Sequence, residues 1–442
     1  MKKYIISSYI PNSDLDADFL NAMRVYSKKN QAQLIIGECK ANYVVDSEDP
    51  YQEAIKEELK DVLLVKGKKL NKNLKITEFR ECINVIDPLS GLESLVAMEG
   101  SLIVPFPRHR FKVVPRNLTE SLTPRAIWCT GTTSEPHYKE TKSGLRMKQF
   151  HLKGALVIEI LDKGIFNIRQ VEWDGKGFYD LDMYYTATSA KKVKDAIIAI
   201  SMGDDHTVYQ DPSAMKKTKD FIAKYKIPHI IRHDTLDSAS ISHHVEGKYL
   251  TKSLMNYTLE EELSLTAESF KDFERSFPWA FQYAVASNHP EHLDRYLDEC
   301  RYKEDYINHV LALELVYNKS IGNSPYKYSM NKFAEGLPRT MFLERKDSIK
   351  LAGIELGNHG DEGPSGARAS SKSLGLSYSG KCVGAHTHSP EIGVYGNYTN
   401  GTLTFLSLPY TKDSGSSGWL NTNTIIYING ARSHHHIIPE AK

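Results

Sequence analysis

The sequence predicts an α/β protein in which two sheets lie against one another and are flanked by helices. From about residue 190 onward, short apolar runs typical of buried strands alternate with amphipathic helical stretches. Consecutive strand-like runs then follow near the carboxyl end of the chain. This order favours layered sheets whose ligands gather at the carboxyl ends of strands. At 442 residues the chain is long for one core, so we expect an amino-terminal α+β domain at 1–190 and a second domain at 191–442.

The amino-terminal region begins with a strand–helix–strand pattern. Residues 3–8 and 33–37 are apolar runs, and apolar side chains recur at helical spacing between residues 14 and 28. A charged helical stretch follows, and the pattern then changes to strands. The expected helix covers 47–62, and the expected strands cover 101–104, 111–114, 126–129 and 155–160.

Two basic clusters lie in this region. They comprise Arg108, His109, Arg110, Lys112 and Arg116, and then Lys139, Lys142, Arg146, Lys148 and Lys153. One interpretation is a set of solvated loop ends. The other is a surface that contacts a phosphate backbone, with Arg108 and Arg110 as candidate substrate-binding residues.

The second region alternates strands and helices before it becomes rich in strands. An apolar run ends at Met202, and an amphipathic pattern follows at 213–226. Further strands are expected at 228–231, 281–287, 392–398, 402–408 and 424–428, and helices at 259–276, 291–300 and 303–317. The histidine run His434–His436 is expected to decorate an edge strand rather than to bind metal.

Composition excludes some classes of function. The formal net charge is +1, so no global field draws the chain to nucleic acid or membrane, and binding of a polyanion needs a local patch. The five cysteines are widely spaced and fit neither a disulfide framework nor a zinc ribbon, which favours a reducing cytoplasm. The basic start Met1–Lys3 is soon followed by polar residues and is expected to begin a strand rather than a secretion signal. No stretch approaches the roughly 20 apolar residues of a membrane span.

Side chains that can bind a metal are concentrated at the ends of the apolar runs. Five such ends carry acids, amides or imidazoles: Asp204 and His206, Asp234 and Asp237, Asn288 and His289, His359, and finally His386 and His388. Any one of these pairs is a weak signal in a chain with 17 histidines, but the ordered set is not. Carboxylates and imidazoles suit Mn, Fe or Zn, and the lack of cysteine among them argues against a structural zinc site.

This order of motifs resembles the calcineurin-like metallophosphoesterase superfamily, over roughly residues 195–410. The family signature runs Asp-x-His, Gly-Asp-x-x-Asp, Gly-Asn-His-Asp/Glu, His and Gly-His-x-His. The resemblance implies a four-layer αββα sandwich with two divalent metal ions. By position, Asp204, His206 and His388 would hold the first ion, Asp234 would bridge both, and Asn288, His359 and His386 would complete the second. His289 would be the catalytic histidine that binds no metal.

The sequence departs from this signature at three places. His233 replaces a glycine, Ala385 is inserted into the last motif, and Pro290 stands where the family has a carboxylate. Glu291 and Asp294 are the candidates to replace that carboxylate and orient His289.

We therefore expect a dimetal-dependent phosphodiester hydrolase that uses a metal-bridging hydroxide, with Mn²⁺ favoured over Fe or Zn. The favoured substrate is DNA, because the resemblance extends to recombination-repair exonucleases and phage-encoded DNases. The alternatives are a small-molecule phosphodiesterase, a phosphoprotein phosphatase or a non-catalytic metal-binding scaffold. Arg368, in a glycine-rich loop, and His244 are further candidates for substrate contact, and a homo-oligomer is one expected assembly.

Overall fold

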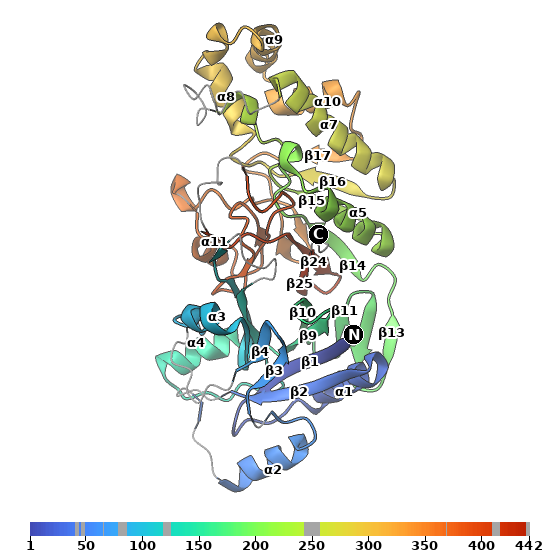
Figure 1. Ribbon diagram of the computed structural model, residues 1–442, viewed down its shortest axis with the longest axis vertical. Helices are drawn as coiled ribbons and strands as arrows, with labels where there is room; N and C mark the ends of the chain where they lie inside the picture. The colour runs from blue at the N-terminus through green and yellow to red at the C-terminus, as the bar shows by residue number, and fades with distance from the viewer. Residues whose placement is uncertain are drawn as a thin grey trace.

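The protein is elongated, with helices at both ends and sheets between them (Figure 1). The computed structural model describes residues 1–39, 44–45, 49–64, 66–77, 86–117, 125–242, 257–367, 369–408 and 416–438. Helices α7–α10 form one end, and α1 and α2 form the other (Figure 1). None of the helices in these ranges combines the length and the apolar character that crossing a bilayer demands.

A six-stranded sheet carries the strands whose ends were predicted to bear ligands. Its order is β17 (Thr340–Phe342), β16 (Phe281–Ala284), β15 (His229–Arg232), β14 (Ile197–Ser201), β24 (Thr422–Tyr427) and β25 (Arg432–His436). The first four are parallel, so their carboxyl ends meet at one edge. Helices α5 (Pro212–Tyr225) and α7 (Leu259–Ser276) cover one face, where Phe221 and Phe273 pack against Ile200.

An eight-stranded sheet draws its strands from both ends of the chain. Its order is β20 (Val383–Gly384), β22 (Tyr398–Thr399), β21 (Glu391–Ile392), β6 (Phe106–Val113), β8 (Ala126–Gly131), β5 (Ser101–Val104), β4 (Leu74–Ile76) and β3 (Lys68–Asn71). The joint is the antiparallel pair β21–β6, in which Ile392 lies opposite Phe111. The boundary placed at residue 190 therefore does not separate two independent sheets, and the amino-terminal region is part of the second layer.

The largest core lies between these sheets. Phe111 and Trp128 from β6 and β8 share one buried cluster with Ile231 of β15 and Ile426 of β24. His434 and His436 of β25 point into it, with ring centroids 5.3 Å and 5.5 Å from that of Phe111. The histidine run is thus not a surface ornament, because its alternate side chains pack against aromatic rings of the facing sheet.

The predicted strand–helix–strand start is confirmed. Strands β1 (Lys2–Tyr9) and β2 (Ala32–Glu38) are parallel and joined by α1 (Ala17–Asn30), whose first turn is capped by Asp16. They belong to a four-stranded sheet of order β10 (Phe166–Glu172), β9 (Gly154–Ile160), β1 and β2. The expected charged helix is present as α2 (Asp49–Leu59). Beside this sheet lie β11 (Gly177–Asp180), β12 (Met183–Thr186) and β13 (Ala190–Lys192), and α3 (Glu93–Glu99) and α4 (Lys142–Phe150) cover the eight-stranded sheet.

The helical end consists of α7 with α8 (Glu291–Asp298), α9 (His309–Ser320) and α10 (Pro325–Phe333), which share one core. The helix predicted from residue 303 begins at His309, after a short 3-10 turn. The remaining elements are α11 (Ser371–Ser377), β7 (Arg116–Asn117), β18 (Lys350–Leu351), β19 (Ile354–Glu355) and β23 (Ser416–Ser417).

The strands predicted at 392–398 and 402–408 are largely loop in the structure. Hydrogen bonds from asparagine side chains hold this segment, where the prediction had the backbone hydrogen bonds of a strand. The amide of Asn400 donates to Ser201 Oγ at 2.8 Å and to the carbonyl of Met202 at 2.9 Å. These bonds tie the loop to the end of β14, next to Asp204.

Candidate metal centre

The loops that follow β14 and β15 stay paired beyond the ends of the strands. The amide of His206 donates to the carbonyl of Asp234 at 2.7 Å, and that of Asp205 to the carbonyl of His233 at 3.0 Å. This short ladder fixes Asp234 beside Asp204 and His206. A Cβ built on Gly203 would lie 2.9 Å from the carbonyl oxygen of Gly401, so the close approach of residues 401–402 requires a glycine there.

Four of the predicted ligands occupy the left-handed region of backbone conformation. The φ angles are 38° at His206, 43° at Asp234, 74° at His386 and 56° at His388. Such conformations are costly for residues other than glycine and concentrate at functional sites. Here they turn each side chain from the end of its strand toward a common centre.

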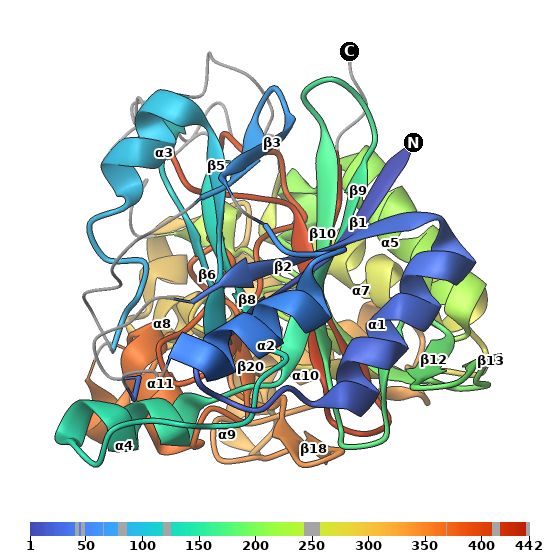
Figure 2. The ribbon, with the colours of Figure 1, turned by 90° about the horizontal axis from the view of Figure 1, so that it is seen from below.

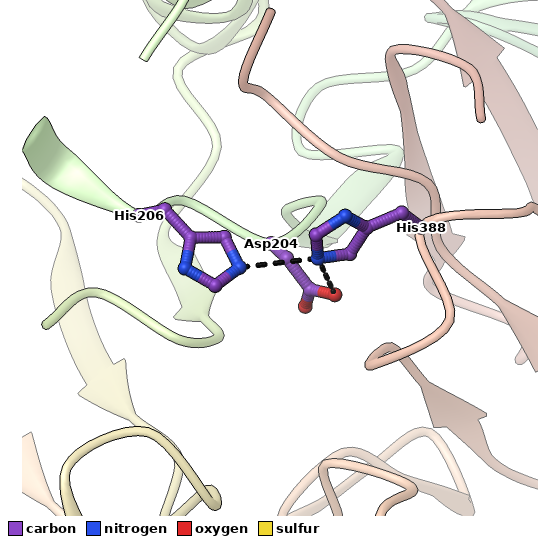
Figure 3. Close-up of side chains that lie close together, drawn as sticks. All are labelled: Asp204, His206 and His388. Atoms are coloured by element: carbon purple, nitrogen blue, oxygen red, sulfur yellow. Dashed lines mark hydrogen bonds and ion pairs between the residues drawn. The ribbon is translucent and has the colours of Figure 1, made fainter. Parts of the chain in front are cut away.

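The first group consists of Asp204, His206 and His388 (Figure 3). Nε2 of His388 lies 3.1 Å from Oδ2 of Asp204 and 3.1 Å from Nε2 of His206. Nδ1 of His206 lies 2.6 Å from Oδ1 of Asp237. A proton held on Nδ1 by that carboxylate leaves the lone pair of Nε2 directed at the centre, as a metal-ligating histidine requires.

The second group shares Asp234 with its neighbours. Asp234, His359 and His386 can each place one ligand atom within 4.8 Å of the others, and so can Asp234, His206 and His289. Nε2 of His359 lies 3.0 Å from Oδ2 of Asp234. Asp234 therefore lies between the two groups, where a bridging carboxylate is expected.

The carboxylates of this centre are buried and contact imidazole nitrogens. Oδ2 of Asp204 lies 3.1 Å from Nε2 of His388, and Oδ2 of Asp234 lies 3.0 Å from Nε2 of His359. Oδ1 of each carboxylate and Oδ1 of Asn288 have no hydrogen-bond partner among the described residues. Asp204 and Asp234 are 0% and 1% exposed. Buried carboxylates with so few donors are strongly unfavourable unless cations compensate them. This set of oxygen and imidazole ligands fits two divalent ions.

Most of the protonation states suit metal binding, whereas at His359 burial opposes protonation but the charge of Asp234 raises the pKa. Burial opposes ionisation of Asp204, but the imidazoles of His388 and His359 hold the pKa of that carboxyl below its usual value. Burial lowers the pKa of His386 and His388. Ionised carboxylates and neutral imidazoles are the forms that coordinate a metal.

His289 is oriented by Asp237 rather than by the acids that follow it. Its Nδ1 lies 3.0 Å from the carbonyl oxygen of Asp237 and 3.3 Å from Oδ1. Burial opposes protonation, yet the charges of Asp234 and Asp237 raise the pKa of His289 to about 10. The two residues expected to orient it have other partners: Glu291 pairs with Arg345 at 2.7 Å, and Asp294 with Lys319 at 2.7 Å.

Asp237 is thus the main site residue that the sequence analysis left without a role. Its signal was present as the second acid of the Asp-x-x-Asp motif. A second omission is the fully buried pair of Arg232 and Asp205, in which Nε of Arg232 donates to Oδ2 at 2.9 Å. A third is Trp419, whose ring centroid lies 4.3 Å from that of His388.

The expected contact of Arg108 and Arg110 with a polyanion is not supported. Each side chain is 3% exposed. Arg110 donates to both oxygens of Asp87, at 3.1 and 3.2 Å, and lies 2.9 Å from Oε1 of Glu391. Arg108 donates to the carbonyls of Ile86 and Val394. These two arginines of β6 therefore bind to residues in and next to β21 and stabilise the pairing of the two strands. Arg368 and His244 lie outside the described residues.

Comparison with known proteins gives one similar chain. Protein A1 of Escherichia phage T5 is 28% identical over 461 residues, which cover 98% of this chain and 81% of that protein. Its name states neither a reaction nor a ligand. No protein-family model matches the chain, and no solved structure matches it.

Proposed function

We propose that this protein is a dimetal-dependent phosphodiester hydrolase and that its substrate is DNA. The observation that carries the proposal is the convergence of the buried carboxylates of Asp204 and Asp234 with imidazoles supplied from separate loops. Two facing sheets with helices outside them are compatible with the four-layer sandwich that the motif order implies.

The residues fall into distinct roles. Asp204, His206 and His388 would hold one divalent ion, His359 and His386 the other, and Asp234 would lie between them. Asn288 would complete the second site, as its place in the motif order implies. When bound, such a pair supplies an activated water and neutralises charge on the phosphate oxygens. Mn²⁺ is the first ion to test, ahead of Fe and Zn.

His289 would act on the leaving group. Asp237 holds Nδ1 of the His289 imidazole, so Nε2 is left to face the substrate. A positioned imidazolium can stabilise a phosphoryl oxygen or protonate the departing oxygen, worth roughly 10² to 10⁴ in rate.

DNA is favoured by the resemblance and by one feature of the site. Trp419 is half-buried beside His388, where its ring can stack against a base near the scissile phosphate. A small phosphoester remains the second candidate, and the burial of Arg108 and Arg110 favours it, because their predicted role in holding DNA is lost.

Hydrolysis assays with Mn²⁺ separate these substrates. We expect cleavage of plasmid, linear duplex or single-stranded DNA, together with a bis-nitrophenyl phosphodiester. Hydrolysis of the small ester alone would exclude the nuclease. Failure on every substrate, with metal bound, would favour the non-catalytic scaffold.

The proposal includes self-association. Exposed apolar side chains recur at intervals of three or four residues along one side of α9 and the turn before it: Tyr306, Val310, Leu313, Tyr317 and Ile321. A second copy of the chain would bury this stripe. Light scattering should give a dimer whose mass halves on V310K, and a monomer at all concentrations would contradict the assembly.

A further inference from the structure

A cavity of about 570 Å³ lies at the edge of the eight-stranded sheet opposite to β20. The hairpin β3–β4 and the end of α3 form most of its wall, and Figure 2 shows α3 beside β3 and β5. This volume is within the range of small-molecule and cofactor sites. None of the candidate metal ligands lines it.

The lining is strongly basic. Among the described residues it includes Lys69, Lys72, Lys75, Arg116 and Arg125, against one acid, Glu99. Glu99 is already paired with Lys75. Lys69 and Lys72 are exposed and make no ion pair with any residue that the structure describes. Because the whole chain carries only +1, this is a marked local concentration of positive charge.

Asn71, in the wall of the cavity, has a side-chain amide nitrogen that the protein encloses. Oδ1 of Asn71 accepts from the amide of Asn73 at 2.8 Å, whereas its Nδ2 is buried and makes no hydrogen bond to a described residue. Arg116 is 6% exposed, and burial and then the charge of Arg125 lower the pKa of its guanidinium. Cations crowded around one cavity favour an anion with several acceptor oxygens, such as a phosphate group.

We propose that this cavity binds phosphate groups of a nucleic acid strand and so holds the substrate away from the metal centre. The described lining contains no aromatic side chain, so bases would not be stacked there, and phosphates would be bound without regard to sequence. The identity of the strand as substrate rests on the proposed function, but its binding does not.

Fluorescence anisotropy of a 5′-labelled 20-nucleotide single strand tests the cavity in EDTA, where cleavage cannot occur. The variant K69Q/K72Q removes two exposed cations. Affinity at 0.1 M salt should fall at least ~10-fold, and the slope of log K against log salt should decrease by about 1.4. The matched control K191Q/K194Q, also exposed but outside the cavity, should change affinity less than ~2-fold.

The variant E99Q should change the affinity for the strand in the opposite direction. Removing the one acid of the described lining and releasing Lys75 should raise affinity, whereas a loss of fold would lower it. Equal affinity of wild type and K69Q/K72Q would overturn the proposal. So would equally effective competition by free deoxyadenosine monophosphate at the same nucleotide concentration, because the cavity would then hold mononucleotides. Failure of the hydrolase itself would appear separately, as no cleavage of any phosphoester by the wild type.

Discussion

Asp237 contacts His289 through two atoms, its carbonyl oxygen at 3.0 Å and Oδ1 at 3.3 Å from Nδ1. The same carboxylate lies 2.6 Å from Nδ1 of His206. One buried acid therefore orients both a candidate metal ligand and the candidate acid. The family signature has a carboxylate directly after the catalytic histidine, where this chain has Pro290. Here Asp237, from the second motif, provides the carboxylate beside His289.

Replacing Asp237 should disturb both histidines. In D237N the amide can present an N–H to Nδ1 of His206, which favours the wrong tautomer, so metal affinity should fall roughly 10- to 100-fold. Mn²⁺ titration monitored by calorimetry measures this affinity. E291Q, which alters only the pair with Arg345, should change affinity less than ~2-fold, and the reverse ranking would restore Glu291 as the orienting acid.

Removal of His289 should separate turnover from metal binding. H289A should lose roughly 10² to 10⁴ in kcat on the small ester while its metal content stays at the wild-type level. The control is H292A, because the ring of His292 stacks on that of His289 with centroids 5.5 Å apart but belongs to none of the metal-binding groups. If H289A lost metal in proportion to activity, His289 would be a ligand.

The buried pair beneath the site should support the fold. The guanidinium of Arg232 lies over the rings of Phe270 and Phe273, with its carbon 4.5 Å and 4.4 Å from their centroids, and donates to Asp205. R232M leaves a buried carboxylate uncompensated and should cost about 3 to 5 kcal/mol in urea unfolding. R232M/D205L removes both charges and should recover much of that loss, so equal destabilisation of the two variants would count against this account.

Stability should depend on pH through the histidines of β25. Burial lowers the pKa of His435 to about 3 and that of His436 to about 4. Below pH 6.5 these histidines bind protons in the unfolded chain but stay neutral in the folded chain. The free energy of unfolding should therefore fall from pH 6.5 to about 4. H435Q should reduce this slope by up to one proton, and an unchanged slope would show that His435 titrates normally in the fold.

The candidate ligands could be predicted from the sequence because each follows an apolar run, and such runs correspond to buried parallel strands that end at the same edge of a sheet. Asp204 and Asp234 follow β14 and β15, and the parallel pairing of those strands brings them together. The role of Asp237 was harder to predict. Its contacts with two imidazoles depend on loops that are far apart in the sequence and adjacent in the fold, so a local pattern does not reveal them.

The joint between the two halves of the chain could not be predicted. Arg110 has the sequence signature of a surface cation, yet its partners include Ile392, 282 positions away. Pairing at that separation is decided by packing and not by local pattern. Because of this pairing, residues before 190 and residues after 380 contribute strands to one eight-stranded sheet, although residue 190 itself lies in β13 of a separate sheet. Lys69 and Lys72 lie at the other edge of the eight-stranded sheet and are exposed.

The most direct test of the metal centre is to locate and count bound Mn²⁺ by anomalous diffraction and elemental analysis. The wild type should hold two ions about 3.5 to 4 Å apart, with Asp234 between them and Asp204 beside the first. D234A should lose the pair. Manganese bound elsewhere, or wild-type protein that binds none while correctly folded, would contradict the account.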